Sequence, residues 1–111
     1  MNKILFLMSL VSFSAFSSEI LKDKLAELVN INSGSQNFKG VNQVQQKLGS
    51  WLESIGFSVE FIKNPEGQIS GDLLIANYPG SSEKTLTLVM HADTVFEPTS
   101  PFQRMEILSV E

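Results

Sequence analysis

The spacing of apolar residues changes abruptly at Gly56, and this change constrains the fold more than any other feature of the sequence. Apolar residues before it recur every three or four positions: Val41, Val44, Leu48, Trp51 or Leu52, and Ile55. This spacing predicts a helix whose apolar face, Trp51 included, packs into a core. After Gly56, apolar and polar residues alternate from Phe57 to Ile62, which predicts a half-buried strand. Glycine is the residue best suited to end the helix between them.

The rest of the pattern predicts one further helix and two further strands. Four apolar residues lie on one helical face near the start of the chain: Leu21, Leu25, Leu28 and Val29. A break rich in turn formers follows at residues 32–36. Residues 72–78 and 85–91 are predicted strands, and the apolar end of the second, Leu88–Met90, predicts burial on both faces. We therefore expect a single α/β domain with two helices followed by about three strands.

Residues 1–17 have the three-part layout of a secretory signal peptide. Lys3 precedes the uncharged apolar stretch Ile4–Phe13, and small residues stand at Ala15 and Ser17, before a cleavage site after Ser17. A buried N-terminal helix or a membrane anchor is the alternative, but spanning a bilayer takes roughly 20 apolar residues. We therefore expect export to the periplasm or the medium, and no membrane association after cleavage.

Composition excludes several classes of function. The chain of 111 residues carries eight basic and twelve acidic residues, a formal net charge of −4, and no basic patch. Nucleic acid is therefore not an expected partner. The chain has no cysteine. A disulfide framework, a thiolate metal site and a cysteine nucleophile are all excluded.

His91, the only histidine of the chain, lies where the third predicted strand gives way to a loop. In open α/β sheets, functional groups gather at the carboxyl ends of strands. Asp93 lies two residues further on, and a metal-binding histidine usually donates its second ring N–H to a carboxylate or carbonyl. Spacing alone nevertheless favours a structural histidine, because short motifs often occur by chance. A catalytic Ser-His-Asp arrangement is compatible with the composition, but no serine lies in a nucleophile-elbow motif.

Four stretches, taken in order, resemble the N-terminal part of a known metallopeptidase family. They are "LVNINSGS" (Leu28–Ser35), "GVNQVQQKLGSWLESIGFSVE" (Gly40–Glu60), "GDLLIANYPG" (Gly71–Gly80) and "HADTVFEPTSPF" (His91–Phe102). The last is similar to the family's His-x-Asp-Thr metal motif followed by a Ser-Pro-Phe element. On these motifs the chain resembles the zinc-dependent aminoacylase and carboxypeptidase family, in particular its glutamate carboxypeptidase-like branch.

The resemblance implies a zinc-exopeptidase-type sandwich and a two-zinc hydrolase. Its substrates would be small peptides or acyl-amino acids, cut at an amide bond next to a free carboxylate. By position in the motif, His91 would be a zinc ligand and Asp93 would support that ligand. Two metal ions at such a site activate water and polarise the carbonyl that is attacked.

The sequence departs from the family after the Ser-Pro-Phe element. The family continues with an aspartate that bridges both metals, a pair of glutamates and a distant histidine, and no residue up to Glu111 matches them. Glu106 and Glu111 lie in no matching motif, and we assign them no role. We therefore expect residues 18–111 to be a truncated portion of a catalytic domain, inactive alone and without stable zinc binding. The alternative is a non-catalytic, exported α/β binding module that retains part of the scaffold.

Overall fold

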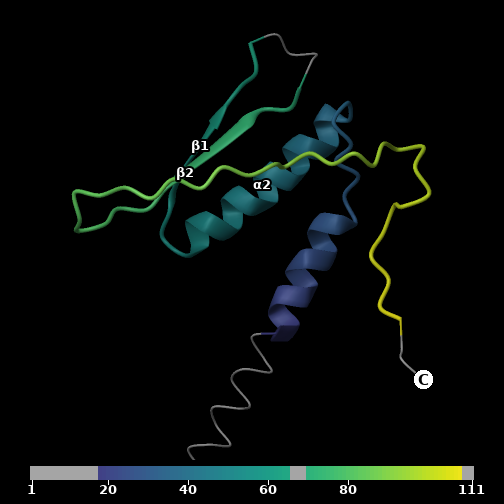
Figure 1. Cartoon of the computed structure of the whole chain (residues 1–111), viewed down its shortest axis with the longest axis horizontal. Coiled ribbons are helices and arrows are strands. Elements are labelled where there is room, and N and C mark those ends of the chain that lie inside the picture. The colour runs from purple at the N-terminus through teal and green to yellow at the C-terminus, as the bar shows by residue number, and fades with distance from the viewer. Residues whose placement is uncertain (1–17, 66–69, 109–111) are drawn as a thin grey trace, which may run out of the picture. The chain divides into compact units, whose positions relative to one another are not determined.

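The computed structural model describes residues 18–65 and 70–108, which form a small mixed α/β fold of two helices and two antiparallel strands (Figure 1). The predicted signal peptide lies outside these residues, as does Glu111. The described residues divide into two compact units. One comprises residues 18–30 and 104–108, and the other is Ile31–Gln103. No helix in the described part of the chain combines the length and the apolar character needed to cross a membrane.

The first unit confirms the first predicted helix, which covers residues 18–29. Its exposed surface carries the ion pair Glu19–Lys22, three residues apart, with Nζ and Oε1 separated by 2.9 Å. Leu21 and Leu25 of the predicted apolar face are exposed. At the end of this helix, Asn30 accepts a hydrogen bond from the backbone N–H of Met105 at 2.9 Å. This bond ties the described C-terminal segment to the helix within the same unit.

The second unit is built on α2 (Phe38–Ser54), the second predicted helix. Asn37 caps its N-terminus: the side-chain oxygen accepts a hydrogen bond from the N–H of Gly40 at 3.2 Å. The Asn37 amide also donates to the backbone oxygen of Asn32 at 2.9 Å. The cap therefore joins the helix to the preceding loop as well as satisfying a free N–H at the helix start.

Gly56 ends α2 as predicted. Its φ of 99° is positive, the region that glycine enters without steric cost. The N–H of Gly56 donates to the oxygen of Glu53, and that of Phe57 donates to the oxygen of Leu52, both at 3.0 Å. These two bonds form a Schellman motif, which satisfies the last helical carbonyls and turns the chain directly into the first strand.

Two of the three predicted strands form a hairpin. Strands β1 (Ser58–Ile62) and β2 (Leu73–Asn77) are antiparallel, with Ser58 opposite Asn77 and Ile62 opposite Leu73. Both lie within one residue of their predicted limits at each end. Figure 1 shows the hairpin lying against α2.

The core lies between α2 and the hairpin and is small. Val41 and Val44 are its buried apolar side chains among the described residues. Gly49 permits close packing, since a Cβ there would stand 2.7 Å from Cζ of Phe61. Two polar contacts join α2 to the start of β2: Gln45 donates its side-chain amide to the oxygen of Asp72, and Asn42 accepts from the Asp72 N–H at 2.8 Å.

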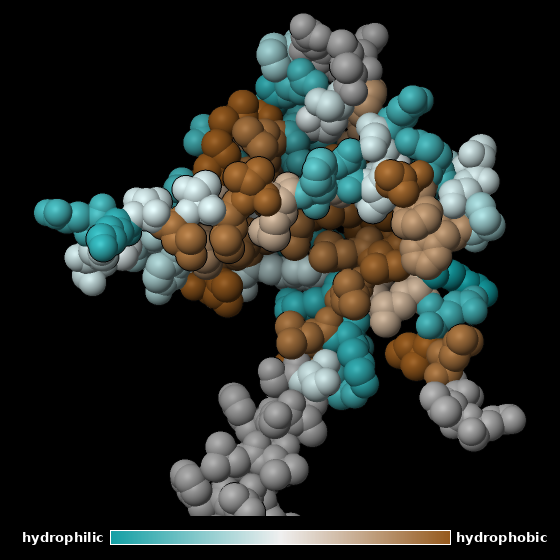
Figure 2. Space-filling view, viewed as in Figure 1, coloured by the Kyte–Doolittle hydropathy of each residue, from teal (hydrophilic) through white to brown (hydrophobic). Residues whose placement is uncertain are grey.

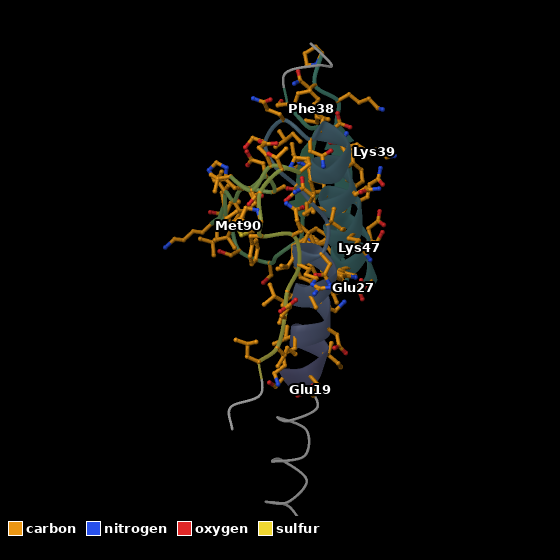
Figure 3. All side chains as sticks on the ribbon, turned by 90° about the vertical axis from the view of Figure 1, so that its right-hand side faces the viewer. Glu19, Glu27, Phe38, Lys39, Lys47 and Met90 are labelled. Carbon is orange, nitrogen blue, oxygen red and sulfur yellow. The ribbon has the colours of Figure 1, made fainter. Side chains whose placement is uncertain are left out.

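The prediction of a third strand at residues 85–91 is wrong. In the described structure these residues form no ladder, and the burial on both faces that their apolar run predicts for a complete domain is not found in this chain. The apolar side chains of this segment are largely exposed: Leu86, Leu88, Val89 and Met90. Met90 lies on the side of the chain opposite Lys39 and Lys47 of α2 (Figure 3). A strand exists only through hydrogen bonds to a neighbour, and no described segment pairs with this one.

The fold class is therefore confirmed at the coarse level of a mixed α/β arrangement. A two-stranded hairpin against one helix does not clearly match a zinc-exopeptidase sandwich. The apolar side chains of Phe61, Ile62 and Leu73 in the hairpin are exposed. Figure 2 shows hydrophobic surface over this part of the molecule.

Candidate functional site

Two loops about 60 residues apart in sequence are joined at the candidate site. Thr94 donates its N–H to the oxygen of Ser33 at 2.8 Å, and Ser35 donates its N–H to the oxygen of Thr94 at 3.0 Å. These bonds form an isolated parallel bridge between Gly34 and Thr94. The "SGS" stretch, predicted only as a break between helices, therefore holds the loop that carries Asp93.

Gly34 is required at this junction because the two loops approach closely. A Cβ at position 34 would stand 2.8 Å from the Cα of Glu97 and 2.6 Å from its Oε2. The side-chain amide of Asn32 strengthens the junction by donating to the oxygen of Phe96 at 2.9 Å. The same amide lies 3.0 Å from Oε1 of Gln103. Backbone and side-chain bonds thus fix residues 93–97 against residues 32–35.

The loop after Asp93 is folded on itself. Ser100 donates its N–H to the oxygen of Glu97 at 2.8 Å, which closes a turn. The rings of Phe96 and Phe102 pack with their centroids 4.7 Å apart, a distance typical of stabilising aromatic pairs. The Ser-Pro-Phe element of the sequence therefore provides a folded support for the site.

His91, Asp93 and Ser35 form a chain of hydrogen bonds. Nδ1 of His91 lies 3.0 Å from Oδ1 of Asp93, and the hydroxyl of Ser35 donates to Oδ2 of Asp93 at 2.7 Å. An ionised carboxylate can only accept hydrogen bonds, so Nδ1 must carry the proton in this contact. Nε2 of His91 is then left as the nitrogen that can bind a metal or accept a proton. The His91 side chain is 92% exposed, and that of Asp93 is 37% exposed.

The same contacts shift the acidity of Asp93. The hydrogen bond from Ser35, followed by that from His91, holds the pKa of the Asp93 carboxyl below its usual range. Hydrogen bonds donated to a carboxylate stabilise its charged form. Asp93 is therefore ionised, and remains an acceptor for the His91 ring, at neutral pH.

Both candidate residues from the sequence thus lie together, in the arrangement that a metal-binding histidine and its supporting carboxylate require. A complete zinc site needs three or four protein ligands. No group of three histidine, cysteine, aspartate or glutamate side chains that could hold a metal ion occurs among residues 18–65 and 70–108. The described residues therefore fit one ligand position of a zinc site and do not fit a whole site.

Ser35 is the site residue that sequence reasoning missed. It lies 58 positions from Asp93, so no local spacing connects the two. The sequence signal was the "SGS" stretch, whose small residues permit two backbones to approach. That signal predicts a turn equally well, and only the tertiary structure reveals what lies opposite it.

A shallow groove elsewhere in this unit is separate from these residues. It is lined by Ile31 and five side chains of α2: Gln43, Gln46, Lys47, Ser50 and Trp51. Neither His91 nor Asp93 lines it. The groove offers a mixed polar and apolar surface without a group of ionisable side chains, and we assign it no role.

Comparison with known proteins gives one informative match. No protein-family model matches the chain, and no solved structure matches it. The chain is 33% identical over 72 residues to carboxypeptidase G2 of Pseudomonas sp. (strain RS-16). The matched stretch covers 65% of this chain and 17% of that protein. The chain is thus similar, over most of its own length, to a small part of a carboxypeptidase, and this similarity relates it to a hydrolase.

Proposed function

We propose that this chain is the N-terminal part of an exported zinc-dependent hydrolase that cleaves peptide or acyl-amino-acid amide bonds, as a carboxypeptidase does. The observation that carries the proposal is the His91–Asp93 contact of 3.0 Å, which leaves Nε2 of an exposed ring available. The similarity to carboxypeptidase G2 supports the reaction class. In this proposal His91 is a zinc ligand and Asp93 orients it.

The roles of the two side chains follow from their chemistry. A neutral imidazole binds a metal through the nitrogen that lacks a proton. Asp93 accepts a hydrogen bond from the Nδ1–H of His91 and so favours the tautomer in which Nε2 carries no proton. A zinc ion at this position would polarise the carbonyl of the substrate and lower the pKa of bound water. Residues 18–65 and 70–108 supply no further group of ligands for a zinc ion, so we expect no turnover by this described part of the chain alone.

The proposal is tested by a chimera with carboxypeptidase G2. Residues 18–111 of this chain replace the corresponding part of that protein, and hydrolysis of an N-acyl-glutamate is measured with zinc. We expect activity that His91→Ala abolishes and Asp93→Ala lowers about tenfold to a hundredfold. Lys84→Ala, a change at an exposed turn residue, is the matched control and should leave the activity unchanged. A chimera equally active with and without His91 would refute the proposed role.

A second candidate is a non-catalytic exported binding module, favoured by the exposed apolar side chains between Leu86 and Met90. Exposed apolar surface is typical of sites where another protein binds. The same chimera separates the two candidates. A folded chimera that binds zinc as carboxypeptidase G2 does but lacks activity would favour the binding module. Activity that depends on His91 favours the hydrolase.

A further inference from the structure

We infer that Ser35 is a positioning residue that acts through Asp93 to fix the tautomer and orientation of the His91 ring. The importance of this role for a reaction rests on the proposed function, but the physical effect on His91 does not. The inference starts from the way in which the two oxygens of Asp93 are divided: Oδ1 faces Nδ1 of His91, and Oδ2 accepts from the Ser35 hydroxyl.

A second bond to Asp93 matters because the carboxylate rotates easily. The terminal torsion of an aspartate is broad, so one hydrogen bond leaves the plane of the carboxylate poorly defined. Bonds to both oxygens, at 3.0 and 2.7 Å, define that plane. The His91 side chain is 92% exposed and gains little orientation from packing. Its order therefore depends on the hydrogen bond to Asp93, and through Asp93 on Ser35.

Ser35 is itself held firmly enough to serve this role. Its N–H donates to the oxygen of Thr94 at 3.0 Å, and the N–H of Thr94 donates to Ser33 at 2.8 Å. The hydroxyl of Ser35 also lies 3.1 Å from the oxygen of Thr94. The Ser35 hydroxyl has only one hydrogen to donate. The charged Asp93 carboxylate is both nearer and a stronger acceptor than the Thr94 carbonyl, so the hydroxyl donates to Asp93. The backbone bridge thus places the hydroxyl where it donates to Asp93.

Ser35 and the His91–Asp93 pair come from two different loops of the chain. His91 lies two residues before Asp93, and its side chain is far more exposed than that of Asp93, so the bond to Asp93 is the contact that orients the ring. Ser35 belongs to the loop that leads into the capped helix α2. The hydroxyl therefore connects Asp93, and through Asp93 the His91 ring, to the loop that precedes α2.

The inference is tested by nitrogen-15 NMR of the full chain without metal or substrate, at a pH where His91 is neutral. The ratio of the Nδ1–H to the Nε2–H tautomer is measured for the parent, Ser35→Ala, Ser35→Thr and Ser35→Cys. We expect Ser35→Ala to lower this ratio about threefold to tenfold, the effect of losing one hydrogen bond. Ser35→Thr keeps the hydroxyl and should restore the parent ratio. Ser35→Cys, a weak donor of similar size, should give an intermediate ratio.

Ser82→Ala is the matched control, because the Ser82 hydroxyl is bonded within its own exposed turn to the N–H of Lys84. It should leave the tautomer ratio of His91 unchanged. A parent-like ratio in Ser35→Ala would overturn the inference. If Ser35→Ala fails to fold, a parent-like ratio in the more conservative Ser35→Cys would overturn it equally.

The outcome is independent of the proposed function. The tautomer ratio requires neither zinc nor the rest of a catalytic domain. A chimera whose activity ignores His91 would refute the hydrolase proposal and leave the effect of Ser35 on the ring intact. An unchanged tautomer ratio in Ser35→Ala and Ser35→Cys would refute the positioning role and leave the hydrolase proposal standing.

Discussion

At the scale of single residues, the pKa of Asp93 depends directly on the hydrogen bonds of the candidate site. Its lowered pKa has two main causes, the hydrogen bond from Ser35 and then that from His91. Both bonds stabilise the carboxylate relative to the neutral acid. A residue from a distant part of the chain therefore keeps the carboxylate that orients His91 charged to lower pH.

Ser35→Ala is expected to raise the pKa of Asp93 toward that of an ordinary aspartate, because the largest stabilising contact is lost. Because the pKa of Asp93 is lower in the folded than in the unfolded protein, its carboxylate stabilises the folded protein at pH values above about 3.9. This stabilisation is lost as the pH falls through the lowered pKa. The stability difference between parent and variant should therefore shrink in that acidic window. Carbon-13 NMR of the Asp93 carboxyl measures the midpoint, and identical midpoints would contradict the assigned cause.

At the scale of secondary structure, the helix-to-strand turn at Gly56 positions the hairpin. Its φ of 99° and the two bonds of the Schellman motif direct the chain from α2 into β1. The hairpin then packs against α2, in which Val41 and Val44 are the buried apolar side chains among the described residues. The sequence predicted this turn correctly because glycine and the change of apolar period are both local signals.

Gly56→Ala is expected to destabilise the protein by about 1–2 kcal/mol, the cost of a Cβ in the left-handed region. The added Cβ would also stand 3.3 Å from Cε2 of Tyr78. Gly80→Ala is the matched control: its Cβ would have its nearest neighbour at 4.0 Å, and no positive φ is required there. Urea unfolding compares the two, and equal stabilities would show that the turn tolerates a side chain.

At the scale of the whole molecule, apolar residues divide into a few buried ones and many exposed ones. Val44 is 6% exposed and Val89 is 90% exposed, although both lie in apolar patterns typical of a complete domain's core. The difference follows from their neighbours: Val44 lies on α2, which packs against β1 and β2, and no described strand pairs with residues 85–91. Stability should therefore depend on position far more than on residue type.

Val44→Ala and Val89→Ala delete the same atoms and form a matched pair. We expect Val44→Ala to lower the free energy of unfolding by about 1–3 kcal/mol, because it removes buried methyl groups. Val89→Ala should change that free energy by less than about 0.5 kcal/mol, as surface substitutions do. Chemical denaturation measures both. Equal losses would show that Val89 is buried in solution and that residues 85–91 pack against a partner.

The sequence by itself determined the local structure: two helices, the turn at Gly56, the hairpin, and His91 followed by Asp93 at the start of a loop. Each depends on residues close together in the chain, whose periodicity and backbone preferences act locally. The tertiary structure alone decided that residues 85–91 form no strand and that Ser35 bonds to Asp93. Strand formation and the Ser35 contact both need partners far away in sequence, and the spacing of residues along a chain does not specify which distant groups meet.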